Sequence, residues 1–153
     1  MLSIEQQVVT REQAQELYDL GFRLDTQWYW VQCYKTRIPA WAEPKHAETK
    51  PAGWRLYSRG DFINKRKARK GSDILSAPTV AELAIILPWM VNTSSIYTLM
   101  IWRCGAGWGV DYFNDLNRPL INRWAGENLA KTMGDRVIWL AEEKILIPEE
   151  TKC

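Results

Sequence analysis

The chain has 153 residues, of which 46% are hydrophobic and 25% are charged, and its formal net charge is +2. This length and composition indicate one globular domain, spanning residues 1–153, with enough apolar side chains for a substantial core. A net charge so close to zero excludes attraction of nucleic acid or an anionic membrane by the field of the whole chain.

The first predicted element is a short helix over residues 11–20. Thr10 followed by Gln13 forms the pattern of a capping box, in which each residue bonds the other's backbone amide. Gly21 suits the left-handed position just after a helix, and Phe22 can fold back on Leu17. We therefore expect this helix to end in a Schellman motif.

The next segments alternate between aromatic runs and polar stretches. Residues 27–34 are dense in Trp, Tyr and Val and are apolar on both faces, which predicts a strand in the centre of its sheet. Residues 35–53 hold three prolines and no period, so we expect a long irregular loop. A second strand is predicted at 54–58, and an exposed, mobile loop at 59–72.

The clearest helix signal follows Pro78. Thr79 and Glu82 form a second capping box, and the next apolar residues recur at helical spacing until Pro88. These apolar residues are Val80, Leu83, Ala84 and Leu87. We expect this helix to be largely buried against the sheet.

A hairpin and a third helix complete the predicted fold. Strands at 97–104 and 108–113 flank a Gly-Ala-Gly loop, and we expect Cys104 to face Trp108 across it. Apolar residues at helical spacing predict a helix from about 127 to 144, in which Gly134 indicates close packing against a neighbour. The resulting class is α+β: a mostly antiparallel sheet of three to five strands with about three helices on one face.

The cellular setting is indicated by what the sequence lacks. The start of the chain has neither the basic nor the apolar region of a secretory signal. The longest apolar stretch, residues 83–91, is interrupted by Pro88 and is too short to span a membrane. Three cysteines without CxxC spacing fit a reducing compartment. We expect a cytoplasmic protein.

Tryptophan is the most informative residue type in the chain. The nine tryptophans are Trp28, Trp30, Trp41, Trp54, Trp89, Trp102, Trp108, Trp124 and Trp139. Two of them, Trp102 and Trp139, lie in strongly amphipathic segments and are expected in the core. Those at loops and element ends, where exposure is expected, are Trp41, Trp89, Trp108 and Trp124. The surplus of rings predicts that at least one contacts a ligand or partner.

Aromatic and cationic residues together suggest a candidate binding site. The basic run from Lys65 to Lys70, with aromatic rings just upstream, can combine phosphate neutralisation with base stacking. The simpler interpretation of this run is a solvated basic loop. The candidate ligand-binding residues are Trp41, Trp54, Tyr57, Trp108 and Trp124 for stacking, with Arg55, Arg59, Lys65, Arg66 and Arg103 for phosphate.

Signals for catalysis are weak. His46 has Glu43 and Glu48 nearby in the same loop, but their spacing fixes no geometry. The acids Asp111, Asp115 and Glu127 are candidate ligands of a divalent cation. Ion pairs with Arg103, Arg118 or Arg123 are the simpler explanation of these acids. Cys33 and Cys104 are expected to be buried thiols. We predict no catalytic residue, no metal and no cofactor.

Two segments carry a resemblance to other proteins. They are APTVAELAIILP at 77–88 and ENLAKTMGDRVIWLAEEKIL at 127–146, separated by the Trp- and Tyr-rich hairpin. Over residues 77–147 the chain resembles small uncharacterised proteins encoded in bacterial prophages and mobile elements. The resemblance implies a phage-linked accessory role, in the cytoplasm of the host cell, and such proteins often act against host defence.

Two classes of function are compatible with these observations. In the first, the protein is a non-catalytic inhibitor that binds a host protein or sequesters a small signalling nucleotide. Such a binder can also be a homo-oligomer, and nucleic acid is a further ligand if Lys65 to Lys70 contact phosphates. The alternative is a metal-dependent phosphodiesterase or nuclease that uses the scattered acids. The lack of a phosphate loop or a recognisable nucleophile favours the binder.

Overall fold

A computed structural model describes residues 3–37, 48–61, 74–121 and 126–148. The elements are η1 (Ile4–Gln6), α1 (Arg11–Asp19), β1 (Trp28–Arg37), β2 (Glu48–Ser58), β3 (Ile74–Ser76), α3 (Val80–Ile86), β4 (Met90–Asn92), β5 (Ile96–Cys104), β6 (Gly107–Phe113) and α4 (Leu129–Glu142). The α+β class and the antiparallel pairing are confirmed.

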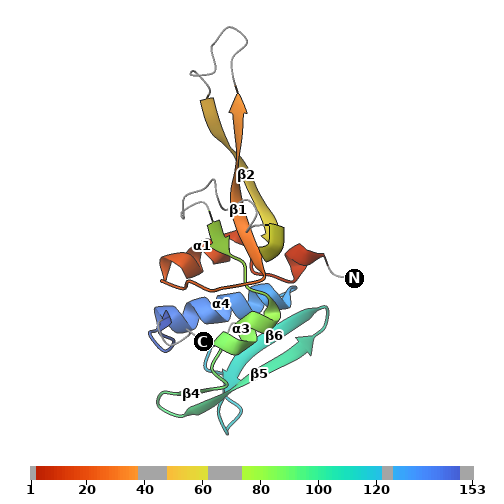
Figure 1. The fold of residues 1–153 in the computed structure, drawn as a ribbon. Helices are drawn as coiled ribbons and strands as arrows, with labels where there is room; N and C mark the ends of the chain where they lie inside the picture. The colour runs from red at the N-terminus through yellow and green to blue at the C-terminus, as the bar shows by residue number, and fades with distance from the viewer. Residues whose placement is uncertain (1–2, 38–47, 62–73, 122–125, 149–153) are drawn as a thin grey trace.

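The strands divide between two three-stranded sheets, with the order β2-β1-β3 in one and β4-β5-β6 in the other. Figure 1 shows α1 and α4 lying between the two sheets. Helix α1 packs on β3, and α4 packs on α1, α3 and β6. No helix within the described ranges is both long and apolar enough to cross a membrane.

The caps predicted for two helices are present. Thr10 Oγ1 accepts from the Gln13 amide at 3.3 Å, and the Gln13 side chain accepts from the Thr10 amide at 3.1 Å. Thr79 and Glu82 cap α3 in the same way.

The end of α1 also follows the prediction. Gly21 has φ +97°, and its amide donates to the Tyr18 carbonyl at 3.1 Å. The Phe22 amide donates to the Leu17 carbonyl at 2.9 Å, which completes a Schellman motif.

The irregular loop predicted for 35–53 is wrong at both of its ends. Strand β1 continues to Arg37, and β2 begins at Glu48, so the two form a long antiparallel hairpin; residues 38–47 lie outside the described part. β2 is an edge strand, where Pro51 needs no amide partner. The register shifts near Gly53, which has φ +106°. This hairpin extends beyond β3 (Figure 1), and there residues 34–35 and 49–53 are exposed, so no apolar alternation marks them as strand.

The central position predicted for the first strand is confirmed, because β1 lies between β2 and β3. The strand at 54–58 is the second half of β2. Of the predicted loop at 59–72, only residues 59–61 are described; they are exposed, as expected, but helical rather than irregular.

The β5–β6 hairpin was predicted correctly, but its register was not. Cys104 pairs with Gly107 and Trp102 pairs with Gly109, one residue away from the expected alignment. The turn contains two residues rather than three, because Gly105 adopts φ +57°. The indole of Trp102 lies directly over Gly109, where an added Cβ would come within 2.2 Å of the ring. With this register, the Trp102 side chain lies on the outward face of the sheet rather than in the core.

The core lies between the two sheets and around α4. Its fully buried members include Val9, Leu75, Leu83, Val110, Tyr112, Met133, Val137 and Leu140. Helix α3 is less buried than predicted: Leu83 is inaccessible, but Ala84 is exposed and Ile85 is 74% exposed. This short helix packs on α4 by one stripe only.

The tryptophans within the described part are all at least partly accessible. Trp89 is 69% exposed, as expected, whereas Trp108 is half-buried. Trp139 packs against the core and is also half-buried. Trp102, expected in the core, instead lies outward against Phe113, with 5.6 Å between the ring centroids. Trp41 and Trp124 are outside the described residues.

Candidate functional site

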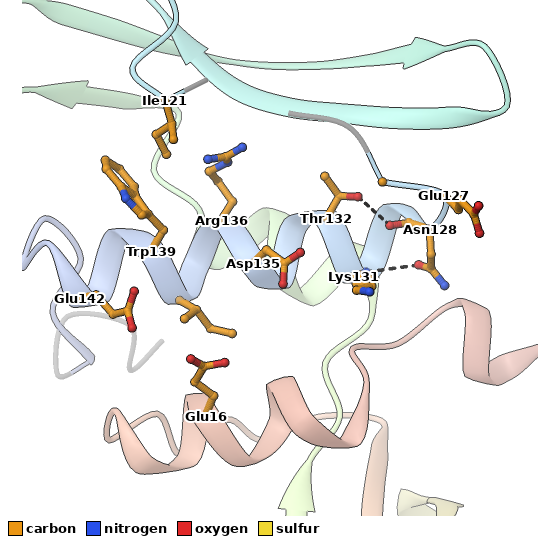
Figure 2. A pocket seen from close by; sticks show the side chains of 12 residues that line it. Glu16, Ile121, Glu127, Asn128, Lys131, Thr132, Asp135, Arg136, Trp139 and Glu142 are labelled. Carbon is orange, nitrogen blue, oxygen red and sulfur yellow. Dashed lines mark hydrogen bonds between the residues drawn. The ribbon is translucent and has the colours of Figure 1, made fainter. Parts of the chain in front are cut away.

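A groove of about 820 Å³ runs along α4, with α1 on one side and the segment before α4 on the other. Figure 2 shows Glu16 of α1 and Ile121 on opposite sides of the helix. The lining residues are Glu16, Ile121, Gly126, Glu127, Asn128, Lys131, Thr132, Asp135, Arg136, Ile138, Trp139 and Glu142. This volume is within the range of ligand-binding sites in proteins.

The wall before α4 is held in place by backbone contacts. Trp108 and Gly126 exchange two backbone hydrogen bonds, of 2.7 and 3.0 Å, so this segment is fastened to β6. Gly126 is required here, because a Cβ would lie 2.4 Å from Thr132 Oγ1. Asn128 then caps α4 by accepting from the Lys131 amide, and its carbonyl accepts from Thr132 Oγ1 (Figure 2).

The opposite wall is fixed by the close approach of α1 to α4. Gln13 Nε2 donates to the Lys131 carbonyl oxygen at 2.8 Å and also to the Asp135 carboxylate. A Cβ on Gly134 would lie 2.9 Å from Val9 Cγ1, so the small residue permits this approach. The close packing predicted at Gly134 is confirmed.

Arg136 is the buried cation of the groove. It is only 5% exposed, and its Nε donates to the Val110 carbonyl oxygen at 2.8 Å. Burial lowers its pKa, and the charges of Asp111 and Asp135 oppose that shift. A guanidinium remains protonated despite such a shift, because its pKa starts so high. The side chain is therefore a fixed positive charge.

Asp111 is the buried anion beside it. It is fully inaccessible, and its Oδ1 accepts from the Tyr112 amide at 2.7 Å. Oδ2 has no hydrogen-bond partner among the described residues. Burial raises the pKa of the Asp111 carboxyl, while the Tyr112 amide and the Arg136 charge oppose the rise. The cation whose charge acts on the Asp111 carboxyl is therefore Arg136, and the expected ion pair with Arg103 or Arg118 is not present among the described residues.

The described lining of the groove is negative overall. Its exposed carboxylates are Glu16, Glu127, Asp135 and Glu142. Among the described lining residues the cations are Lys131 and Arg136, and the charge of Asp111 acts on Arg136. The half-buried indole of Trp139 lies one helical turn beyond Asp135 on α4, on the same stretch of groove. This combination of one indole ring and four carboxylates suits a cationic ligand.

The predicted ligand-binding residues lie elsewhere. Trp54, Arg55 and Tyr57 are on β2, whereas Arg103 and Trp108 are cross-strand partners in the other sheet. None of these five residues lines the groove. The structure thus places these five residues on two separate sheets.

Individual contacts give several of these residues structural roles. Trp54 packs against the core and has the Arg11 guanidinium 5.9 Å above its ring. Arg59 Nη2 forms an ion pair with Asp25 at 2.9 Å. Trp41, Trp124, Lys65 and Arg66 lie outside the described residues, as does His46.

The other expected chemical groups are not assembled. In the described part of the chain, no three His, Cys, Asp or Glu side chains come together as metal ligands would. Asp111 is buried, whereas Asp115 and Glu127 are exposed. Cys33 is half-buried, but Cys104 is exposed, contrary to the prediction for both thiols.

The groove residues were missed because they come from three separate segments. One signal was available in the sequence: Arg136 falls on the apolar stripe of α4, three residues after Met133 and four before Leu140. A charge in such a stripe is expected to have a buried partner or a ligand.

Comparisons with protein-family models, with curated proteins and with solved structures found no match. The likeness to prophage proteins therefore remains a prediction from the sequence.

Proposed function

We propose that this chain is a cytoplasmic, non-catalytic binding protein that holds a basic segment of a partner protein in the α4 groove. The observation that carries the proposal is the excess of carboxylates, four against two cations, among the described residues that line the groove. Lysine and arginine side chains form charge-assisted hydrogen bonds with carboxylates and stack on indole rings. Glu16, Glu142 and Trp139 supply both kinds of contact.

The composition of the groove supports binding rather than catalysis. Its described lining contains no serine, cysteine or histidine. The hydroxyl of Thr132 donates to the Asn128 carbonyl oxygen, so it is engaged in capping α4. A covalent mechanism needs a nucleophile beside a base, and hydrolysis by a metal needs gathered ligands. The alternative of a phosphodiesterase or nuclease gains no support from the described residues.

A nucleotide is a poorer ligand for this groove than a basic peptide. Phosphates would meet four exposed carboxylates, and two of the arginines expected to hold them, Arg55 and Arg103, lie on different sheets. A role as a phage-linked inhibitor of bacterial defence depends on the sequence resemblance alone. Within the proposal, such an inhibitor acts by covering a basic surface of its host partner.

The test is calorimetric titration with a lysine- and arginine-rich peptide, with an acidic peptide as the negative ligand. We expect binding of the basic peptide that weakens with salt. The variant pair Glu16→Gln and Glu142→Gln should each reduce affinity by about two- to fivefold, as exposed ion pairs do. Glu5→Gln, outside the groove, is the matched control and should have no effect.

Two results would contradict the proposal. One is equal affinity of the native protein and the Glu16→Gln, Glu142→Gln double variant for the basic peptide. The other is a rise in melting temperature with nucleotides and none with the peptide, because a ligand that binds only the folded state stabilises it. That outcome would favour the sequestering role instead.

A further inference from the structure

Asp111 lies behind the wall of the α4 groove without lining it. The carboxyl is fully inaccessible, and its Oδ1 accepts from the Tyr112 amide at 2.7 Å. Arg136, which lines the groove, donates from Nε to the carbonyl oxygen of Val110, the residue bonded to Asp111. The amide of Ile121, a second lining residue on the same side of α4 (Figure 2), stabilises the ionised form of this carboxyl. Polar groups of two lining residues therefore adjoin a carboxyl that a ligand in the groove does not touch.

The surroundings of Asp111 determine which charges it balances. Among the described residues, the charged or titratable groups that act on it are the Arg136 guanidinium of α4 and the Tyr112 phenol of β6. Met100, its cross-strand partner on β5, is uncharged, and the Asp135 carboxylate of α4 acts on Arg136. Arg136 keeps its proton, and burial raises the pKa of the Tyr112 phenol, so the phenol stays neutral. Of Asp111, Arg136 and Tyr112, the carboxyl is therefore the one that changes charge across acidic pH.

The Asp111 carboxylate offsets the positive charge of Arg136 in the groove wall. Arg136 is 5% exposed and Asp111 is inaccessible, so water and salt screen their interaction weakly. Arg136 repels a cationic ligand, and a negative charge fixed beside it reduces that repulsion. Removal of the Asp111 charge leaves the four lining carboxylates in place but makes the wall less negative. This change depends on the loss of one negative charge, whatever other contacts Arg136 makes.

We propose that Asp111 is a specificity-determining residue of the groove, which favours a cationic ligand by balancing Arg136 from behind the wall. The inference rests on the proposed function, because it concerns the same groove and the same basic segment of a partner. It assigns part of the binding free energy to a residue that does not contact the partner. A role of Asp111 in the fold alone would change the stability of the protein but would give binding no dependence on the charge of this residue.

The test is calorimetric titration of the lysine- and arginine-rich peptide into the native protein and into Asp111→Asn, which has nearly the same shape. At neutral pH we expect Asp111→Asn to bind the peptide about three- to tenfold more weakly, because one charge is lost in a partly screened site. The ratio of the two affinities should approach one as the pH falls and the native carboxyl takes up a proton. Asp115→Asn removes an exposed carboxylate outside the groove and is the matched control, with no change expected.

Arg136→Gln is the second variant, and its expected effect has the opposite sign. It removes the cation but keeps a donor for the Val110 carbonyl oxygen, so the folded variant should bind the basic peptide more tightly than the native protein does. Circular dichroism and thermal melting establish that each variant is folded. Damage to the groove would weaken binding in both variants, whereas the proposal requires opposite changes.

Equal affinity of the native protein and Asp111→Asn at neutral pH would overturn this inference and leave the proposed function intact. An affinity ratio that does not change with pH would do the same. A basic peptide that does not bind the native protein at all contradicts the proposed function and, with it, the basis of the inference. The two failures are thus distinguishable.

Discussion

Replacement of Arg136 by methionine should be among the most destabilising single changes in the described part of the chain. The arginine is 5% exposed, donates from Nε to the Val110 carbonyl oxygen at 2.8 Å, and lies beside the fully buried Asp111. Methionine retains much of the volume but leaves one buried carbonyl and one buried carboxylate without the cation. Leaving a buried polar group without its hydrogen-bond partner costs about 1–3 kcal/mol, and the loss of a positive charge near the Asp111 carboxyl adds to that cost.

The assay is urea unfolding followed by circular dichroism, with the free energy of unfolding extrapolated to water. A double-mutant cycle with Asp111→Asn isolates the interaction between the two charges. In the Asn background, Arg136→Met loses a hydrogen bond but leaves no buried charge, so its cost should fall by at least about 1 kcal/mol. Lys131→Met is the control for an exposed cation on the same helix and should change stability by less than about 0.5 kcal/mol.

An equal cost of Arg136→Met in both backgrounds would refute this reasoning. It would mean that the Asp111 carboxylate does not respond to the arginine charge, and that the arginine stabilises the fold only through its carbonyl contact and its packing.

Three further predictions follow from particular contacts. Gly109→Ala should destabilise the fold by about 1–3 kcal/mol in urea unfolding, because the added Cβ would lie 2.2 Å from the Trp102 ring. The same substitution should cost less in a Trp102→Leu background. An equal cost in both backgrounds would exclude the ring as the cause. The raised pKa of Asp111 implies a contribution to stability that is fully present below the ordinary carboxyl pKa and is lost as pH rises through the pKa of the folded protein. The difference in free energy of unfolding between the native protein and Asp111→Asn, measured across acidic pH, should follow that course. A difference that does not depend on pH would contradict the prediction. Trp89, 69% exposed, should account for much of the fluorescence that an aqueous quencher removes, so Trp89→Ala should reduce quenching while changing stability by less than about 0.5 kcal/mol.

Local signals in the sequence predicted the helices well. Thr10 and Thr79 each begin a helix through contacts within four residues, and Gly21 ends one by its own backbone preference. Such signals depend on neighbours in the chain and hence can be read without a fold. The central position of β1 was also predictable, since apolar side chains on both faces require cover on both.

Features set by long-range contacts were not predictable in the same way. The register of β5 and β6 depends on a turn of two residues and on the packing of Trp102 over Gly109. The far half of the β1–β2 hairpin is exposed and polar, so no apolar alternation marks it as a strand. The groove is formed by α1, by α4 and by the segment between β6 and α4. No spacing of residues in the sequence indicates that these three parts of the chain lie together.

The pairing of Gln13 with Asp135 joins positions 122 residues apart. One wall of the groove is thus translated early, and its floor is among the last elements of the described chain to leave the ribosome. A nascent polypeptide arrested before α4 has no place to capture a ligand. The binding that we propose for the groove would therefore require a chain whose synthesis has passed α4.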